Sequence, residues 1–485
     1  MSWRLPVSAK GGLLFFLAAV LSLPSAAAPE AGIKPIPPSE YAARRQALAE
    51  SLRAELAPGE LGILLIRSLP EPENATFRQD SNLYYLAGIE VPRSALVLAF
   101  DRTDSALAAT SPGASPNYAE YLYLPASNPR QEKWTGPRLS AGGLEKESLG
   151  PDPERQTAMR LTGFDRIPEG DFPPRRWPRG PVESIGDLPE HLSVFLSRAG
   201  VLFFAAEPGI LGEPLSESMA FQNELRARYP ELKLKDPRAA LGRLRMIKSA
   251  SEIEQLRRAV EITCQAVQDA SRVAAAGAAE YQVQAELERR FILEGARRPG
   301  FPSIIASGPN SCILHYDASE RVLAKGDLLL MDVGAEYRRY SADISRTLPV
   351  GGRFSKEQRK IYDLVYQAQE AALAVAKPGV AFAELDKAAR KVIADAGYGP
   401  YFIHATSHFL GLDVHDDGDT SAVLRPGMVF TIEPGIYLPD KQLGVRIEDD
   451  ILVTATGAEI LSRCLPRRAD AVEMQMGKGL TPGTR

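Results

Sequence analysis

Two aspartates in the second half of the chain are spaced so that they would face each other across a β-hairpin. Asp332 interrupts the apolar run "GDLLLMDVG", and Asp343 follows eleven residues later in a second apolar run. A turn centred on Tyr337 and Arg338 makes the two aspartates direct cross-strand partners, with Cβ atoms about 4.5–5.5 Å apart. Carboxylates this close in apolar surroundings repel each other unless a proton or a cation lies between them.

Two glutamates repeat the arrangement. Glu433 and Glu448 lie fifteen residues apart, symmetric about Asp440 and Lys441, in the stretch "FTIEPGIYLPDKQLGVRIEDDILV". Pro434 makes this register less secure, because proline cannot donate to a strand ladder. A lone strand acid is usually solvated or ion-paired, but two aligned pairs among Val, Ile and Leu predict a site for divalent metal.

Three of the five histidines fall within twelve residues, "HATSHFLGLDVH" at 404–415. His404 and His408 have i, i+4 spacing, but their neighbours favour a strand or loop, and no glutamate follows His404 as in helical zinc proteases. A three-histidine zinc site is the alternative, and it leaves the four carboxylates unexplained. Oxygen-rich ligands with one imidazole suit two ions of Mn²⁺, Co²⁺, Fe²⁺ or Zn²⁺ about 3.5–4 Å apart, which can activate water for hydrolysis.

The other histidines near the acids can contact a substrate. His315, in "CILHYD", together with His404 and His415 can donate protons or hydrogen bonds to a substrate carbonyl, its tetrahedral intermediate or its carboxylate. His191 alone lies outside these segments. We therefore predict one shared site for four of the five histidines.

Helical and strand-like patterns alternate along the chain and must position these residues. Helical periodicity predicts helices at 41–56, 216–229, 280–294, 355–376 and 382–396, and Ser251 with Glu254 predicts a capped helix. Apolar runs predict strands at 61–68, 83–89, 94–100, 201–207, 303–307, 312–316, 327–336, 341–348 and across 428–454. The Pro-, Gly- and Asp-rich stretch 103–190 predicts long loops with scattered short elements. Helices followed by strand pairs, twice, indicate a duplicated αβ unit.

The first residues are typical of a cleaved export signal. The basic residues Arg4 and Lys10 precede the apolar run Leu13–Leu23, and the small residues Ala26–Ala28 follow. Eleven apolar residues are too few to span a bilayer, so we expect cleavage near Ala27 and no membrane association afterwards. The expected location is the periplasm or the exterior of the cell.

Composition narrows the function further. The 485 residues are 45% hydrophobic and 24% charged, as in soluble proteins with two domains. A net charge of −4 and a pI near 5.9 give no basic surface for nucleic acid. Cys264, Cys312 and Cys464 are too widely spaced for a disulfide framework or a sulfur-ligated metal, which leaves open a single bridge.

The acidic and histidine motifs resemble those of the pita-bread metallopeptidases, the family of methionine aminopeptidase, prolidase and aminopeptidase P. The resemblance covers about residues 240–465 and includes "HATSHFLGLDVHD", "TIEPGIYL" and "GVRIEDDILVT". It implies five metal ligands, Asp332, Asp343, His408, Glu433 and Glu448. Asp343 and Glu448 would bridge two ions, and Glu433 would also move protons. In the proline-specific branch, the resemblance implies substrate contacts from His315, His404, His415 and Arg446.

The first half resembles a different domain. "FRQDSNLYYLAGIEVPRSALVL" is similar to the creatinase-like N-terminal domain of aminopeptidase P, which methionine aminopeptidases lack. The implied fold is α+β: a signal peptide at 1–28, an N-terminal α/β domain at 34–240, a catalytic pita-bread domain at 241–470 and a tail at 471–485. The resemblance also implies a homo-oligomer, either a dimer or a tetramer.

The implied activity is a metal-dependent aminopeptidase that releases an N-terminal residue preceding proline. Glu433, His415 and His315 are the expected catalytic residues, and manganese is the first expectation for the two ions, ahead of zinc, cobalt or iron. Ser407 favours aminopeptidase P over prolidase, which cleaves X-Pro dipeptides and is the main alternative. Creatine amidinohydrolase, which shares the fold without the metals, and a non-catalytic binding protein of the same fold are further alternatives. The intact set of five metal ligands argues against both.

Overall fold

The computed structural model describes residues 33–72, 76–102, 118–142, 153–164 and 180–479. The predicted export signal at 1–28 lies outside these residues. In this part of the chain, none of the helices combines the length and the apolar character that a membrane span requires.

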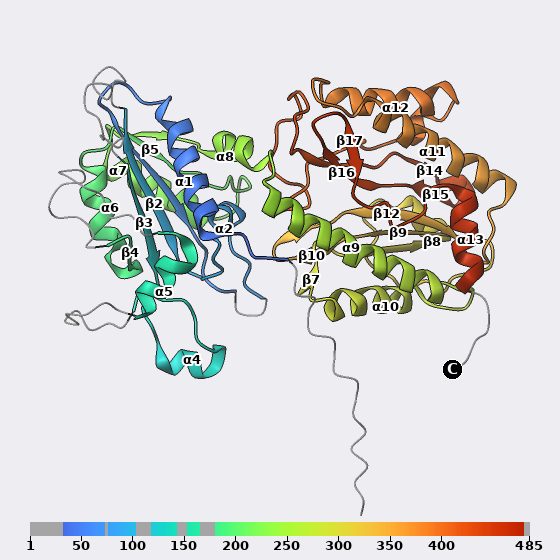
Figure 1. Cartoon of the computed structure of the whole chain (residues 1–485), viewed down its shortest axis with the longest axis horizontal. Helices are drawn as coiled ribbons and strands as arrows, with labels where there is room; N and C mark the ends of the chain where they lie inside the picture. The colour runs from blue at the N-terminus through green and yellow to red at the C-terminus, as the bar shows by residue number, and fades with distance from the viewer. Residues whose placement is uncertain (1–32, 73–75, 103–117, 143–152, 165–179, 480–485) are drawn as a thin grey trace, which may run out of the picture. The chain divides into compact units, whose positions relative to one another are not determined.

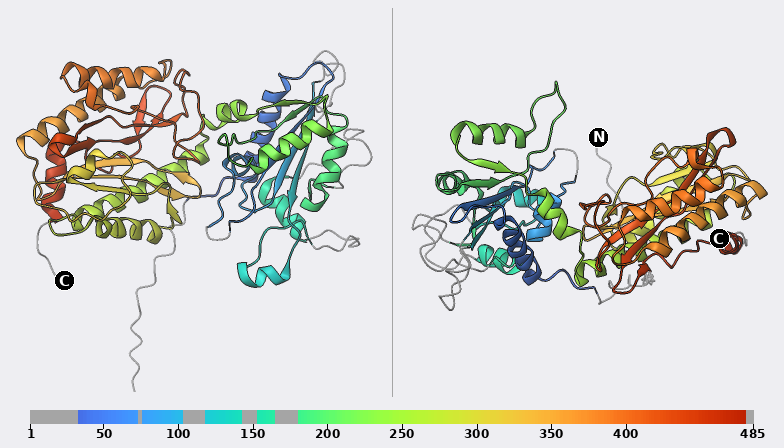
Figure 2. Two further views of the ribbon diagram at one scale, coloured as in Figure 1. Left: turned by 180° about the vertical axis from the view of Figure 1, so that it is seen from behind. Right: turned by 90° about the horizontal axis from the view of Figure 1, so that it is seen from above.

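A six-stranded mixed sheet in the order β4-β3-β2-β1-β5-β6 organises the first half of the chain (Figure 1). Side chains of β1 alternate between two cores, because Leu64 packs with α1 (Pro38–Arg53) and Ile63 packs with α6 (Leu188–Leu196). Helices therefore cover both faces, as the views in Figure 2 also show, and the expected α/β character is confirmed. The strands are β1 (Leu61–Arg67), β2 (Ala95–Asp101), β3 (Tyr118–Leu124), β4 (Val182–Ser184), β5 (Val201–Phe203) and β6 (Lys233–Lys235).

The strand predicted at 83–89 is wrong. Ser81–Ala87 form the helix α2, which begins where the Asp80 side chain accepts a hydrogen bond from Leu83 N at 2.8 Å. The helix ends at Gly88, which adopts the left-handed conformation with φ 67°. The two end signals override the β preference of the apolar and aromatic residues between them.

The described residues of the stretch 103–190 contain short strands and helices, as predicted. Strand β3 is an interior strand whose residues are almost all buried, and α4 (Pro129–Thr135) and α5 (Pro153–Thr162) follow it. The acid Glu120 interrupts its apolar pattern, and Arg45 neutralises that carboxylate at 2.9 Å in the interior. The helix predicted at 216–229 is present as α7 (Glu217–Arg228), and a further helix, α8 (Arg238–Arg245), closes this half.

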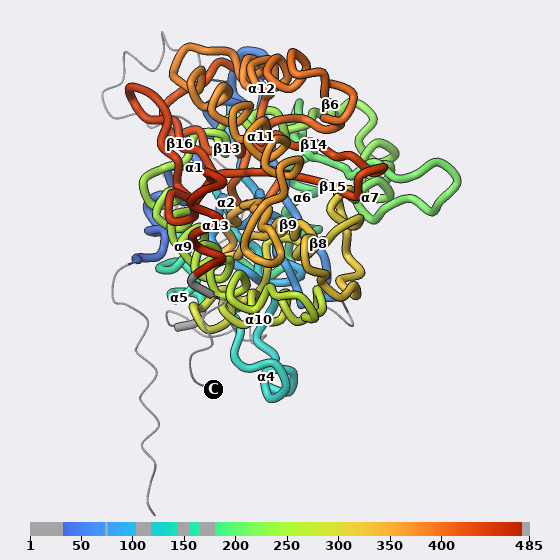
Figure 3. The backbone as a smooth tube through the Cα atoms, turned by 90° about the vertical axis from the view of Figure 1, so that its right-hand side faces the viewer, coloured from blue at the N-terminus to red at the C-terminus, as the bar shows by residue number. Residues whose placement is uncertain are grey.

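Two helix pairs enclose the strands of the second half (Figures 1 and 3). α9 (Ala250–Val273) and α10 (Glu280–Leu293) lie on one side, and α11 (Lys356–Val375) and α12 (Ala383–Asp395) lie on the other. In the chain, each pair precedes a long hairpin that carries one pair of acids. This order is the one expected of a duplicated unit.

The strands between the helices form several short sheets instead of one continuous sheet. A large apolar core that includes the fully buried Phe291, Tyr362 and Phe430 packs against most of them. The strands are β7 (Arg298–Pro299), β8 (Ile304–Ser307), β9 (Leu328–Val333), β10 (Ala335–Tyr337), β11 (Tyr340–Ser341), β12 (Ile344–Pro349), β13 (Val429–Ile432), β14 (Gly435–Leu438), β15 (Leu443–Arg446), β16 (Asp449–Val453) and β17 (Ala458–Ile460).

Three local predictions for this half need correction. The capping box of α9 is formed by Ser249 and Glu252, two residues earlier than expected. Residues 312–316 are not a strand, because a 3₁₀ turn, Gly308–Cys312, opens an irregular loop there. The first part of the predicted tail belongs to helix α13 (Ala469–Gly479), which buries apolar side chains in the core.

A disulfide joins Cys264 in α9 to Cys464 beyond β17, with Cα atoms 6.1 Å apart and a separation of 200 positions in sequence. Cys312 is free. The single bridge that the sequence left open is therefore present, and two of the three thiols are paired.

Candidate metal centre and active site

The first acid-bearing hairpin differs from the predicted register by two residues. Asp332 pairs with Ser345 across β9 and β12, so the prediction that Asp332 and Asp343 are direct partners is wrong. The turn lies one residue later than predicted, at Arg338 and Arg339, which have φ values of 46° and 77°. Because an even shift keeps every side chain on its face, the two aspartates remain diagonal neighbours on one face of the hairpin.

The second acid-bearing hairpin has the predicted register. Its two ladders, β13–β16 and β14–β15, share one register in which Glu433 lies opposite Glu448. The ladders are separated at Pro434, where the sequence predicted a disturbance. A hydrogen bond of 3.4 Å from Ile447 N to Pro434 O crosses the break. The two glutamates therefore face each other where the hairpin backbone is least regular.

The histidine segment runs beside β13 without regular secondary structure, as predicted. Thr431 N donates to His408 O at 2.9 Å, and Glu433 N donates to Thr406 O at 2.8 Å. These bonds bring the side chain of His408 to the acids of the second hairpin. Its Nδ1 donates to Phe409 O at 3.1 Å, which leaves Nε2 free to act as a metal ligand.

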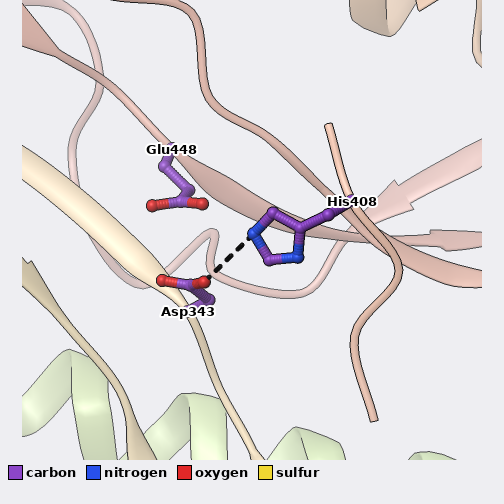
Figure 4. A group of neighbouring side chains, drawn as sticks. All are labelled: Asp343, His408 and Glu448. Atoms are coloured by element: carbon purple, nitrogen blue, oxygen red, sulfur yellow. Dashed lines mark ion pairs between the residues drawn. The ribbon is translucent and has the colours of Figure 1, made fainter. Parts of the chain in front are cut away.

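Asp343, His408 and Glu448 form a compact cluster in which one potential ligand atom from each residue lies within 4.8 Å of the others (Figure 4). His408 Nε2 lies 3.3 Å from Asp343 Oδ2 and 3.5 Å from Glu433 Oε1. Four of the five predicted ligands therefore converge from both hairpins and the histidine segment.

Asp332, the fifth predicted ligand, is paired with the guanidinium group of Arg446. Its Oδ2 accepts a hydrogen bond of 2.6 Å from Arg446. Its Oδ1, like Oδ1 of Asp343, is buried without a hydrogen-bond partner in the described part of the chain. Buried carboxylate oxygens without partners are costly. A divalent ion would satisfy them, so the oxygen-rich donor set fits the metal that the sequence implies.

Electrostatics in the cluster also favour a cation. Burial raises the pKa of Asp343 well above its usual range, and the carboxylates of Glu448 and Asp332 raise it further. Burial likewise raises the pKa of Glu448, and the facing Glu433 adds to the effect. Burial raises the pKa of Glu433 to about 8 even though Arg446 opposes the change. Positive charge placed among these groups would relieve both the desolvation and the repulsion.

All nine residues singled out from the sequence line one cavity of about 670 Å³. Besides the five predicted metal ligands, which are four acids and one imidazole, it contains His315, His404, His415 and Arg446. An apolar wall completes the cavity, formed by Phe301, Pro302, Ile304, Leu314 and Val414. The cavity thus combines a floor of carboxylates and imidazoles with an apolar wall.

His404 is held neutral in this cavity. Burial lowers its pKa to about 4. Nδ1 donates to Ala405 O at 2.9 Å, so Nε2 accepts from the hydroxyl of Tyr437, also at 2.9 Å. The ring of His415 packs edge-on against that of His408 at 4.4 Å. His191 lies elsewhere, bonded to Tyr123 at 3.0 Å, as the sequence predicted for the one outlying histidine.

Sequence reasoning missed two polar residues that connect the site. Tyr437 accepts a hydrogen bond of 2.8 Å from Arg446, and Ser345 accepts another from Arg446, also at 2.8 Å. Ser345 in turn donates to Glu448 at 2.8 Å. The signal for Ser345 was its position opposite Asp332, which becomes visible only with the correct hairpin register.

The fold and site geometry agree with known families. The profile of metallopeptidase family M24 matches residues 254–455, and that of the aminopeptidase P N-terminal domain matches residues 41–152. A Xaa-Pro aminopeptidase of Escherichia coli is 32% identical over 472 residues, which cover 90% of this chain and 97% of the relative. The chain therefore belongs to the M24 metallopeptidases, with the pita-bread catalytic fold and an aminopeptidase P N-terminal domain.

Solved structures place it beside particular members of that family. The aminopeptidase P of E. coli with the inhibitor Pro-Leu has a TM-score of 0.74 at 30% identity, covering 92% of this chain and 99% of that one. Proline aminopeptidase P II from Yersinia pestis has a TM-score of 0.73 at 30% identity, covering 91% and 100%. A Xaa-Pro dipeptidase of Pyrococcus furiosus is 45% identical, but over 224 residues that cover 45% of this chain and 64% of the relative.

Proposed function

We propose that this protein is an aminopeptidase that releases the N-terminal residue from peptides with proline in second position. The observation that carries the proposal is the convergence of the predicted ligands and substrate-contacting histidines on one cavity. The relatives that span nearly the whole chain are Xaa-Pro aminopeptidases, which supports this choice. The partial match to dipeptidases keeps cleavage of X-Pro dipeptides as the second candidate.

Asp332, Asp343, His408, Glu433 and Glu448 would hold two divalent ions. Manganese is the first candidate, and zinc, cobalt and iron accept the same ligands. When bound, the ions would supply Lewis acidity, which polarises a carbonyl and makes water more acidic. Side chains of the cavity carry out proton transfer, oxyanion stabilisation and peptide binding.

Glu433 is the proton carrier in the proposed reaction. It accepts a proton as water attacks the scissile carbonyl carbon, and it delivers that proton to the proline nitrogen as the C–N bond breaks. His415 donates to the developing oxyanion, a role that needs a donor fixed before the reaction. His315, His404 and Arg446 bind and orient the peptide. The products are a free amino acid and a peptide that begins with proline.

The apolar wall accounts for proline selectivity. An X-Pro bond is a tertiary amide whose nitrogen carries no hydrogen. A pocket that surrounds the ring with apolar side chains such as Phe301 and Ile304 therefore needs no acceptor at that nitrogen. The same pocket would leave the N–H of an ordinary amide without a partner, which costs about 1–3 kcal/mol.

Hydrolysis of Ala-Pro-Ala compared with Ala-Pro tests the proposal directly. After chelation, each metal is added back separately and release of free alanine is measured, with Ala-Ala-Ala as the matched control. An aminopeptidase cleaves the tripeptide, with little action on Ala-Ala-Ala. Activity confined to Ala-Pro would instead establish the dipeptidase alternative. A fully metallated protein inactive on both proline peptides would contradict both assignments and favour a binding role.

We also infer export through the N-terminal segment, followed by cleavage near Ala27. The basic start, short apolar run and small-residue exit of residues 1–28 support this inference. N-terminal sequencing of the mature protein and fractionation of the producing cells test it. An intact Met1 in the mature protein would contradict cleavage.

We further propose a dimer or tetramer in solution. The support is the resemblance of the first half to N-terminal domains that join neighbouring subunits. Sedimentation velocity of the metal-loaded protein at several concentrations measures the assembly. A monomer at all concentrations would contradict the proposal.

A further inference from the structure

Glu280, the first residue of α10, is completely buried and binds both ends of the loop that carries His315. At one end, its Oε1 accepts hydrogen bonds from Ser307 N at 2.6 Å and from Ser307 Oγ at 2.7 Å. At the other end, its Oε2 accepts from Arg321 N at 3.0 Å. One carboxylate therefore closes the loop that spans residues 307–321.

The same carboxylate also binds the middle of the loop. Asn310 Nδ2 donates to Oε1 at 3.1 Å, and the hydroxyl of Tyr316 donates to Oε2 at 2.8 Å. Tyr316 is the direct neighbour of His315 in sequence. Its hydroxyl contact thus fixes the backbone from which the histidine projects into the cavity.

Between its two anchored ends, this loop has no strand pairing, and few hydrogen bonds within the loop itself stabilise it. Ile313 N donates to Asn310 O at 2.9 Å, and Ser311 Oγ donates to Gly308 O at 2.6 Å. The His315 side chain is exposed to the cavity and, within the described ranges, makes no hydrogen bond of its own. Its direction must therefore be set by the backbone and by the groups that anchor the backbone.

We propose that Glu280 is a positioning residue for His315. The proposal rests on the proposed function, in which His315 contacts the peptide. All groups that are hydrogen-bonded to the Glu280 carboxylate donate to it, among them the backbone N–H groups of Ser307 and Arg321, and a carboxylate accepts at both oxygens. A glutamine at 280 would turn an NH₂ group toward other donors, so the isosteric Glu280→Gln change should release one side of the loop. Displacement of a substrate-contacting group by about 1 Å can cost on the order of 100-fold in rate.

A double-mutant cycle separates positioning from general destabilisation. Glu280→Gln, His315→Ala and the double variant are assayed for kcat and KM on Ala-Pro-Ala with full metal loading. Glu280→Gln is expected to lower kcat/KM nearly as far as His315→Ala, and the double variant should be no worse than His315→Ala alone. Multiplicative losses would overturn the proposal, because they mean that the two residues act independently.

Glu252 provides a matched control. It is another buried carboxylate at the start of a long helix, and it accepts from Ser249 N at 2.9 Å and from the Tyr340 hydroxyl at 3.0 Å. It does not contact the 307–321 loop in any described hydrogen bond. Any kinetic loss in Glu252→Gln should therefore multiply with that of His315→Ala. Equal coupling for both glutamates would assign Glu280 a role in the core alone.

Hydrogen–deuterium exchange tests the same proposal without relying on peptidase activity. Glu280→Gln, and more weakly Asn310→Ala, should speed exchange in peptides covering 308–320 while leaving 383–395 in α12 unchanged. Unchanged exchange at 308–320 in both variants would overturn the positioning role. If the wild-type enzyme fails to cleave X-Pro peptides while this exchange result holds, the proposed function fails and the anchoring of the loop stands.

Discussion

The guanidinium of Arg446 connects Asp332 to Tyr437 across the floor of the cavity. Nη2 donates to Asp332 Oδ2 at 2.6 Å, and Nη1 donates to the Tyr437 hydroxyl at 2.8 Å. Nε donates to Ser345 at 2.8 Å, so three different nitrogens of one buried side chain are used. The planar fork of arginine supplies this geometry, and the single ammonium of lysine does not.

Arg446→Lys is therefore expected to lower kcat/KM by about 10–100-fold, the usual effect of losing a residue that orients metal ligands. The measurement is steady-state hydrolysis of Ala-Pro-Ala with metal content determined on the same sample. Arg257→Lys is the control, because Arg257 pairs with Glu459 at the surface. Equal activity in the wild type and Arg446→Lys would show that the fork geometry has no part in the reaction.

Chelation is expected to lower the melting temperature, and readdition of manganese should restore it. An ion that binds the folded chain alone stabilises it by about 2.7 kcal/mol at 100 times its Kd. Asp343→Asn should remove most of this metal-dependent rise. Asp363→Asn, which alters a partly exposed acid paired with Arg359 on α11, should keep it. A rise of equal size in Asp343→Asn would place the metal elsewhere.

Removal of the disulfide is expected to lower the free energy of unfolding by about 2–5 kcal/mol, since the bond joins residues far apart in the chain. Urea denaturation of the wild type with and without reductant, compared with Cys264→Ser, measures the effect. Cys312→Ser serves as the control and should unfold like the wild type. Alkylation of the native protein followed by mass spectrometry should label Cys312 alone, and labelling at Cys464 would contradict the bridge.

The ionisation of Asp413 makes the free energy of unfolding depend on pH in the acidic range. Burial raises its pKa, but Arg245, whose Nη2 lies 2.7 Å away, and hydrogen bonds lower the pKa to about 2 overall. Because this value is below the unfolded value of about 3.9, the ionised group stabilises the fold above pH 4, and that contribution is lost as the pH falls toward 2. The difference in unfolding free energy between the wild type and Asp413→Asn should shrink over this range. A difference that stays constant with pH would contradict the assignment.

The sequence predicted the second hairpin well because its signals are local. The turn residues Asp440 and Lys441 sit midway between Glu433 and Glu448, and the structure keeps that register. The first hairpin has no such clear centre. Its turn contains two arginines with positive φ, a conformation that cannot be predicted from these residue types. The aspartates were therefore assigned to the right face but to the wrong partners.

Other elements depended on tertiary contacts. Strand β3 was not singled out because it lies in a stretch rich in Pro, Gly and Asp, and the burial of its Glu120 depends on the charge of Arg45. The residues of helix α2 have high β preference, so the sequence predicted a strand there. The groups at its two ends, Asp80 and Gly88, favour the helix. The contribution of Glu280 could not be foreseen, since its donors come from positions 307 to 321 and meet only in the fold.

The bond between Cys264 and Cys464 encloses every predicted metal ligand within one covalent ring, because all five lie between these two positions in sequence. A protease that nicks any surface loop inside the ring would leave two fragments that remain attached. Such a clipped molecule would migrate as one species on a non-reducing gel and as two after reduction. In an oxidising environment, the disulfide would therefore keep the metal-ligand residues in one covalently connected molecule after a single cleavage of the backbone, which close packing alone does not ensure.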